Sequence, residues 1–185
     1  MCRAIDLDAA IESKADELAR TIVRMAADGT SGNLRETLLE IDPLAARRAL
    51  EETVCLYLFI AKKSSLVFLD EALISPYHRD AFNARMLDAV IGHLTAGEVE
   101  LERASARISD LWYLRREAYA SRAHLYRHPS ESLDQTVMYD FYTNILALGS
   151  DLCLFVMADL QVPLLHLELS RHFAQLICEA MGIEA

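Results

Sequence analysis

The chain has 185 residues, and hydrophobic residue types make up 53% of it. Its formal net charge is −10 and its pI is near 5.0. A chain of this length buries a substantial core as one unit, so we expect residues 1–185 to form a single domain. The acidic balance disfavours binding to nucleic acid and to anionic membrane surfaces, because both carry negative charge.

The cysteines and the first residues favour a reducing, cytoplasmic location. The four cysteines are far apart and form no C-x-x-C motif: Cys2, Cys55, Cys153 and Cys178. Three of them lie in apolar runs, where a free thiol behaves as a small buried hydrophobe. Residues 1–6 contain no apolar segment of the kind that forms the core of a secretory signal.

Helix-start signals recur along the chain, and none of them marks a catalytic motif. Asp42-Pro43 and Ser75-Pro76 each place a capping side chain before a proline at the first helical position. Three further segments have the pattern of full or near capping boxes: Asn33-x-x-Glu36, Thr95-x-x-Glu98 and Ser132-x-x-Gln135. Apolar residues between these signals repeat with helical period, without strand-like alternation. We therefore predict an all-α, single-domain helical bundle.

The first half of the chain contains three predicted helices. The first covers residues 4–28, a short one covers residues 33–41, and a longer one begins at Pro43. Residues 54–60 are apolar on all sides, so this helix is either central in the bundle or covered by a second subunit. The polar residues 62–65 either break this helix or mark a turn of it that faces solvent.

The second half contains four more predicted helices. One covers residues 76–94, and a long charged helix covers residues 98–127. His128-Pro129 ends the charged helix, because a residue before proline disfavours the helical region. The last two helices cover residues 132–160 and 163–181. The total is about six long helices plus one or two short ones.

Residues 145–169 are rich in leucine and need to be tested as a membrane span. Asp151, Asp159 and Glu168 interrupt this stretch. A carboxylate near the centre of a bilayer costs about 2.5–3.5 kcal/mol. We therefore expect two buried helices joined at Val162-Pro163, and no contact with a membrane.

Metal ligation and catalysis find little support in the sequence. The chain has no Glu-x-x-His motif, which carboxylate-bridged di-iron bundles require on two helices. His124 and His128 lie one turn apart, but a third ligand would have to come from His78, His93 or an acid on another helix. The alternative is that His128 sits at a helix end, where the helix dipole favours it. We assign no catalytic residue, metal or cofactor.

One segment differs from the rest of this acidic chain. Residues 115–128 hold four arginines and two histidines against one acid. Aromatic and basic residues recur there at three- and four-residue steps, so they share one helical face: Trp112, Arg115, Tyr119, Arg122 and Tyr126. Three interpretations remain open. The arginines pair with acids of neighbouring helices, or the face binds a protein, or it holds an anionic ligand.

These observations lead to three hypotheses on function. The first is a non-enzymatic helical-bundle protein that acts through self-association, as a homodimer, and through binding of a partner protein. The second is a binder or sensor of a small anionic or apolar ligand, with a pocket between helices that the aromatic and basic face anchors. The third is a metal-dependent helical-bundle enzyme that uses the histidine pair.

Overall fold

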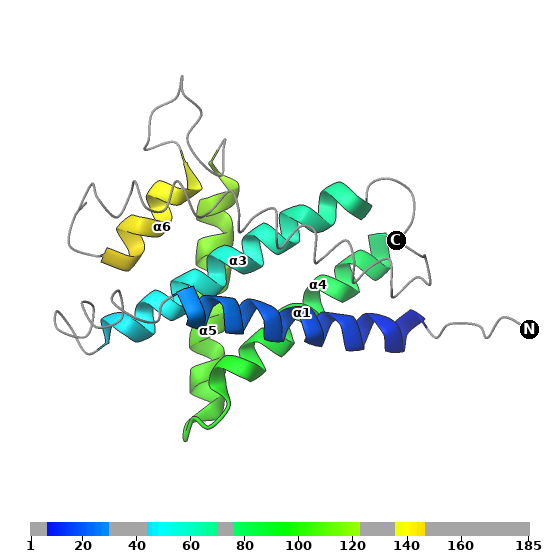
Figure 1. The fold of residues 1–185 in the computed structure, drawn as a ribbon, viewed down its shortest axis with the longest axis horizontal. Coiled ribbons are helices and arrows are strands. Elements are labelled where there is room, and N and C mark those ends of the chain that lie inside the picture. Colours follow the sequence, from blue (N-terminus) through cyan, green and yellow to red (C-terminus); the bar gives the residue numbers. More distant parts are fainter. Residues whose placement is uncertain (1–6, 30–43, 70–75, 123–135, 147–185) are drawn as a thin grey trace, which may run out of the picture.

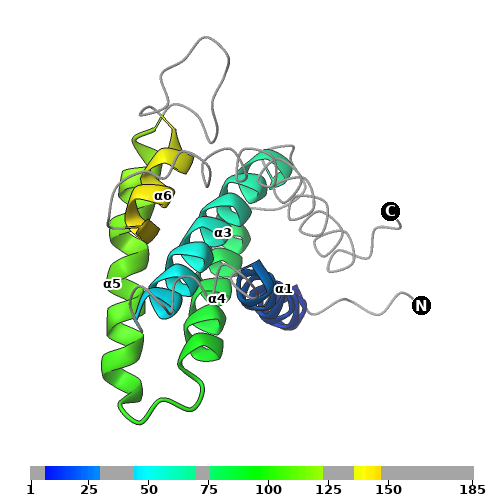
Figure 2. The same cartoon turned by 60° about the vertical axis from the view of Figure 1, so that its left-hand side comes forward.

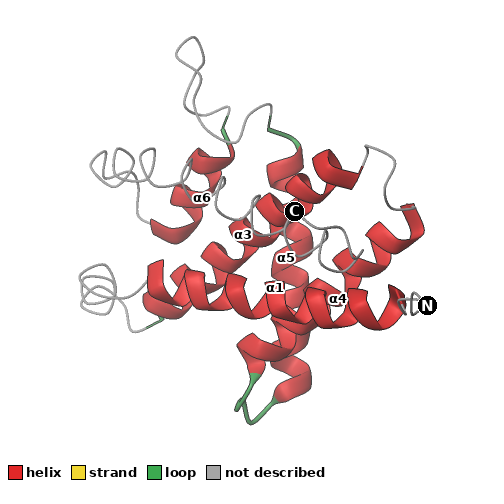
Figure 3. Ribbon diagram, turned by 45° about the vertical axis from the view of Figure 1, so that its right-hand side comes forward, coloured by secondary structure: helices red, strands yellow, loops and turns green. Residues whose placement is uncertain are grey.

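The structure is a computed structural model of the chain. It describes four ranges: residues 7–29, 44–69, 76–122 and 136–146. Every regular element within them is an α-helix (Figure 3), which confirms the all-α class. Five helices are described, so the expected count of six long helices is slightly off. The helices predicted at residues 33–41 and 163–181 lie outside the described residues.

Four of the five described helices are arranged around the fifth. They are α1 (Leu7–Gly29), α3 (Ala45–Leu69), α4 (Pro76–Thr95), α5 (Leu101–Ala120) and α6 (Val137–Leu146). Helix α3 lies in the middle and contacts each of the other four (Figure 1). Helix α1 packs along α4, in the most extensive contact between two helices. A tight turn joins α4 to α5, and α6 packs against α3 and α5 (Figure 2).

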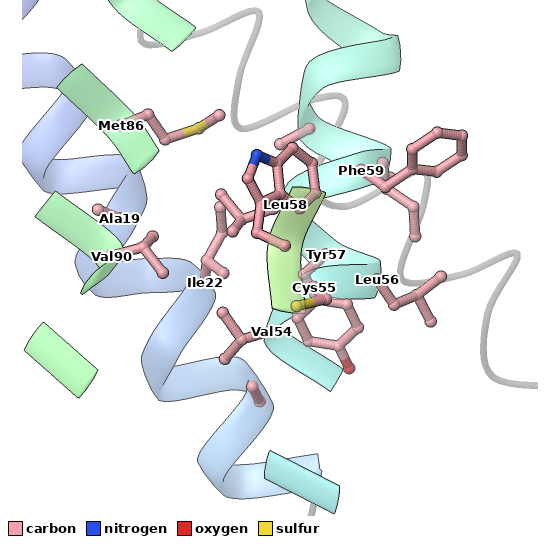
Figure 4. Close-up of a cluster of buried hydrophobic side chains, with 14 of the residues drawn as sticks. Ala19, Ile22, Val54, Cys55, Leu56, Tyr57, Leu58, Phe59, Met86 and Val90 are labelled. Carbon is pink, nitrogen blue, oxygen red and sulfur yellow. The ribbon is translucent and has the colours of Figure 1, made fainter. Parts of the chain in front are cut away.

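The apolar run of α3 forms the centre of the core. Every residue from Val54 to Ala61 is at most 7% exposed. Ile22 of α1 and the α4 residues Met86 and Val90 lie beside this run (Figure 4). Of the two alternatives for this helix, the central position is confirmed. The chain itself covers residues 54–60, so this segment offers no surface to a second subunit.

Helix α3 continues without a break through the polar residues 62–65 and ends at Leu69. Lys62 is half-buried and Lys63 is exposed. The Lys63 ammonium lies 5.3 Å from the centre of the Phe59 ring, a distance at which a cation is attracted to an aromatic face. These lysines therefore mark a part of the helix that reaches solvent, and a break at this point is excluded.

The apolar stripes predicted for the first and fourth helices point into the core. Among their described members, Met25 and Leu94 are half-buried against the core, and the others are buried: Ala15, Leu18, Ile22, Phe82, Met86 and Val90. His93 lies in the last turn of α4, as the sequence predicts. Its Nε2 lies 2.9 Å from a carboxylate oxygen of Asp16, so a polar contact joins α4 to α1 at the edge of the apolar stripe.

The capping box predicted at Thr95 and Glu98 is wrong. Helix α4 extends to Thr95, whose hydroxyl donates a hydrogen bond to the carbonyl oxygen of Ile91 at 2.8 Å. Gly97 follows with a φ of +89°, a conformation that residues with a Cβ rarely adopt, and it turns the chain. Helix α5 then begins at Leu101 without a side-chain cap. The Thr95 hydroxyl is therefore used at the end of one helix and is not available at the start of the next.

The other helix ends also differ from the predicted boundaries. Helix α5 ends at Ala120, earlier than the predicted end near residue 127. Helix α6 begins at Val137, after Thr136, whose hydroxyl oxygen accepts a hydrogen bond from the backbone N–H of Tyr139 at 3.1 Å. This contact is an N-cap of the usual geometry. The capping boxes predicted at residues 33–36 and 132–135 lie outside the described residues.

The described helices contain no segment that is both long and apolar enough to cross a membrane. Of the leucine-rich residues 145–169, the structure describes only the first two, which form the end of α6.

Replacing Leu58 with alanine should destabilise the fold strongly. Leu58 is 1% exposed in the middle of α3, and loss of a buried leucine side chain costs about 2–5 kcal/mol in proteins. The matched control is Leu101→Ala, because Leu101 is 54% exposed and its loss should change stability by about 0.5 kcal/mol or less. Urea unfolding of the three proteins measures both differences. Equal effects of the two substitutions would contradict the position of Leu58 in the core.

Candidate functional site

The residues predicted to share one face of the charged helix do so, and this face points into the bundle. Trp112 is 5% exposed and Tyr119 is fully buried, Arg115 is half-buried between them, and Arg122 is half-buried two residues after the last residue of α5, Ala120. We call these four residues the inner face of α5. Tyr126, the fifth predicted member, lies outside the described residues.

Arg115 is held by a buried carboxylate of the central helix. Its Nε and Nη2 donate hydrogen bonds to the two carboxylate oxygens of Glu52 at 2.7 Å and 2.6 Å. The Glu52 side chain is 3% exposed and that of Arg115 is 17% exposed. The hydrogen bond to Glu52 raises the pKa of Arg115 above its ordinary value. Two parallel charge-assisted bonds in a buried setting fix the distance and the rotation of α5 relative to α3.

Arg122 makes a second contact of the same kind, to α6. Its Nε and Nη2 donate hydrogen bonds to the carboxylate oxygens of Asp140 at 2.6 Å and 2.5 Å. The side chains are 32% and 14% exposed, so solvent screens this pair more than the first. Arg115 in α5 and Arg122, two residues after its end, thus bind one carboxylate on each of α3 and α6.

A further network of ion pairs connects the start of α3 to α5 and to the turn before it. Glu51 accepts hydrogen bonds from Arg47 at 2.9 Å and from Arg107 of α5. Arg47 also donates to Glu98, in the turn after α4, at 2.6 Å. The pairing of arginines with acids of neighbouring helices, one of the three interpretations open from the sequence, is confirmed for Arg115 and Arg122.

Cys55 and Tyr119 lie beside the Glu52–Arg115 pair, and both are protonated at neutral pH. Burial raises the pKa of the Cys55 thiol and the pKa of the Tyr119 phenol, and the neighbouring Glu52 carboxylate adds to both effects. A nucleophile or a general base must reach its ionised form, which these surroundings disfavour. The inner face of α5 therefore has the chemistry of a structural contact between helices.

The Tyr119 hydroxyl is an exception within this well-paired region. The Tyr119 ring packs edge-on against Phe59, with 5.4 Å between the ring centres. Its hydroxyl oxygen is buried without a hydrogen-bond partner among the described residues. The Asn144 side chain on α6 is near enough to lower the pKa of the phenol through a polar contact, but the contact lacks the geometry of a hydrogen bond, and its effect is smaller than the increase caused by burial.

An open cleft lies on another side of α5, between that helix, α3 and α4. Its volume is about 240 Å³. Buried apolar side chains form part of its lining, among them Leu58, Met86 and Trp112. Charged side chains also line it, and they come from all three helices: Lys62, Asp80 and Arg116. We call this feature the charged cleft.

The side of α5 that faces away from the bundle carries two large apolar residues. Tyr113 is 48% exposed and Leu114 is 60% exposed. The Arg116 guanidinium lies 5.1 Å from the centre of the Tyr113 ring and stacks on it. Around the two apolar residues are exposed charges of both signs: Arg103, Asp110 and Glu117. These five residues, Tyr113 and Leu114 included, are the outer face of α5.

The histidine pair considered for metal binding, His124 and His128, lies outside the described residues. Within the described ranges, no group of three His, Cys, Asp or Glu side chains is placed to hold a metal ion. His93, one of the possible third ligands, is instead in contact with Asp16.

Sequence reasoning missed the partners of the inner-face arginines and the members of the charged cleft. Glu52 lies two residues before Val54, the first residue of the apolar run of α3, and a carboxylate so close to a fully apolar segment was a usable signal of a buried pair. Lys62, Asp80 and Arg116 come from three helices. Periodicity within a helix says nothing about which helices are neighbours, so no signal of this site was present in the sequence.

Removing Arg115 should destabilise the protein far more than removing an exposed arginine. Arg115→Ala leaves the Glu52 carboxylate buried without its partner, which costs about 3–5 kcal/mol in comparable buried pairs. The double variant Glu52→Leu/Arg115→Met should recover most of this loss, because no unpaired charge remains. The control is Arg20→Ala, since the side chains of Arg20 and its partner Asp16 are 63% and 44% exposed and lie outside α5. Chemical unfolding is the measurement, and a double variant as unstable as Arg115→Ala would contradict this account.

Replacing Tyr119 with phenylalanine should leave the stability unchanged or raise it by about 1 kcal/mol. The substitution removes a buried hydroxyl that has no partner among the described residues and keeps the ring against Phe59. Asn144→Ala is the companion variant and should not alter the effect of the first substitution. A loss of 1 kcal/mol or more for Tyr119→Phe, cancelled in the Asn144→Ala background, would instead show that the two side chains are hydrogen-bonded.

The comparisons with known proteins give no relative: no protein-family model, no curated protein and no solved structure matches this chain. Its function is therefore argued from its own residues and their geometry.

Proposed function

We propose that this chain is a non-enzymatic helical-bundle protein that acts by binding another protein, and that its first partner is a second copy of itself. The observation that supports this is the outer face of α5. Tyr113 and Leu114 expose about half or more of their surface there, beside the stacked guanidinium of Arg116. Tyrosine and arginine are the residue types that contribute most to protein–protein interfaces.

Charge complementarity favours a second copy as the partner. Arg103 and Glu117 lie on opposite sides of Asp110 along α5, and the same number of residues separates each of them from Asp110. Two α5 helices that pack antiparallel about a two-fold axis at Asp110 therefore bring Arg103 of each copy beside Glu117 of the other, so two opposite-charge pairs stand against one contact between the two Asp110 carboxylates. Closed two-fold dimers are the most common assemblies of soluble proteins, and their interfaces must be complementary to themselves in this way.

The hypothesis that the inner face of α5 binds a small anionic ligand has less support than the dimer. This hypothesis assigned the anion to the arginines of the inner face. Arg115 and Arg122 already bind carboxylates of the protein, each through two N–H groups of its guanidinium. An anionic ligand would have to displace Glu52 or Asp140. We include a cytoplasmic location in the proposal, with support from Cys55, which is a free, buried thiol.

Leu114→Asp should separate the dimer, because it places a charge in the apolar part of the interface. We expect the wild-type protein to have twice the 20.8 kDa mass of one chain in light scattering after size exclusion. The variant should weaken dimerisation by about tenfold or more. The matched control is Val99→Asp, because Val99 is 99% exposed in the turn before α5 and lies outside the proposed interface.

The orientation of the two copies is tested by reversing charges. Arg103→Glu should weaken the dimer, and the double variant Arg103→Glu/Glu117→Arg should restore it, because the pair between the copies is then reversed and not lost. A wild-type protein that stays monomeric at tens of micromolar, or a Val99→Asp variant as disruptive as Leu114→Asp, would overturn the proposal.

A further inference from the structure

The charged cleft has the composition of a small-molecule site. Leu58, Met86 and Trp112 are 5% exposed or less and give it apolar walls. Lys62 and Arg116 place two cationic groups along the same lining. A concave apolar surface with a few convergent polar groups is typical of sites that bind small ligands. The cleft does not include the inner face of α5 to which the sequence assigned a ligand, apart from the Trp112 ring.

The charges of the cleft favour an anion. Burial and the neighbouring Arg116 guanidinium lower the pKa of Lys62, and the Asp80 carboxylate opposes this effect without cancelling it. Asp80, the carboxylate in the lining, is in contact with Arg79 at 3.2 Å. Two cations, Lys62 and Arg116, therefore line the cleft together with one carboxylate that is already paired with an arginine, in a chain whose net charge is −10. A bound anion relieves the repulsion between Lys62 and Arg116, whereas a bound cation increases it.

Arg116 differs from the other arginines of α5 in how it is held. Arg115 and Arg122 each bind a carboxylate of the protein through two hydrogen bonds. In the described part of the chain, Arg116 is held by an aromatic ring, with its guanidinium 5.1 Å from the centre of Tyr113. Stacking on a ring leaves the edge of the guanidinium, which carries its N–H donors, able to bind the two oxygens of a carboxylate.

The volume of the cleft limits the apolar part of the ligand. A cavity of about 150 Å³ is large enough to hold benzene. The cleft, at about 240 Å³, therefore accommodates one aromatic ring or a short branched chain together with a carboxylate group. The half-buried Leu87 and the small exposed part of Trp112 offer the ring an apolar surface to pack against.

We infer that the charged cleft binds a small monocarboxylate that carries a single aromatic ring or a branched apolar group, with the carboxylate on Lys62 and Arg116 and the apolar part against Trp112. This inference does not depend on the proposed dimerisation. The two are distinguishable, because one is measured as ligand binding and the other as the mass of the particle in solution.

The probe that we would use is phenylacetate, titrated into the full-length protein by calorimetry and followed by the rise in melting temperature. A ligand of this size should bind with a Kd on the order of 1 mM. Acetate, which has the charge without the ring, and benzyl alcohol, which has a ring without the charge, should each bind at least about tenfold more weakly. Binding that is equal for acetate and phenylacetate would overturn the inference, as would no binding of phenylacetate at about 10 mM, tenfold above that Kd.

Variants of the cleft test the location of the site. Lys62→Gln and Arg116→Gln should each weaken phenylacetate binding by about tenfold or more, because each removes a charged donor. Lys63→Gln is the matched control, since Lys63 is the next residue of α3 and does not line the cleft. Ala84→Phe should abolish binding by filling the cleft, because Ala84 is an exposed member of its lining and the substitution leaves the core unchanged. Unchanged binding in these variants, with folding verified by circular dichroism, would overturn the inference.

Discussion

Burial of α3 on all of its sides is the constraint on which the rest of the described structure depends. A helix whose residues from Val54 to Ala61 are all apolar or small has no face to turn toward water. Each buried side chain of this type contributes about 1.5–3 kcal/mol when it leaves water, so the other helices are required on every side. Helices α1, α4, α5 and α6 all contact α3 for this reason, and the contact between α1 and α4 closes the core around it.

Apolar burial alone does not determine how a surrounding helix is rotated, and here the charged residues contribute. Glu52 is buried two residues before the apolar run of α3, and its carboxylate binds Arg115 of α5 with both oxygens. A buried carboxylate that loses such a partner is costly, so other rotations of α5 are disfavoured. Arg122 and Asp140 set the position of α6 in the same way. The ion pairs thus select one arrangement among those that would bury the same apolar area.

This arrangement gives α5 three surfaces with different properties. Its inner face is occupied by contacts within the chain, and the raised pKa values of Cys55 and Tyr119 beside it disfavour their use as a nucleophile or a general base. Its outer face exposes Tyr113 and Leu114 among charges of both signs. Between the two, Arg116 meets Lys62 of α3 at the charged cleft. The role of each α5 residue therefore depends on which of these three surfaces it belongs to.

The sequence by itself determined that the chain is helical, that residues 54–60 are apolar on all sides, and that the residues Trp112, Arg115, Tyr119 and Arg122 share a face. These conclusions follow from the 3.6-residue period of the α-helix, which is a local property of the chain. Only the tertiary structure decided that α3 is covered by its own chain, that the arginines of α5 bind Glu52 and Asp140, and that Thr95 belongs to α4. The physical reason is that periodicity shows which residues share a face and contains no information on which helix lies opposite. Lys62, Asp80 and Arg116 become neighbours only when three helices have packed.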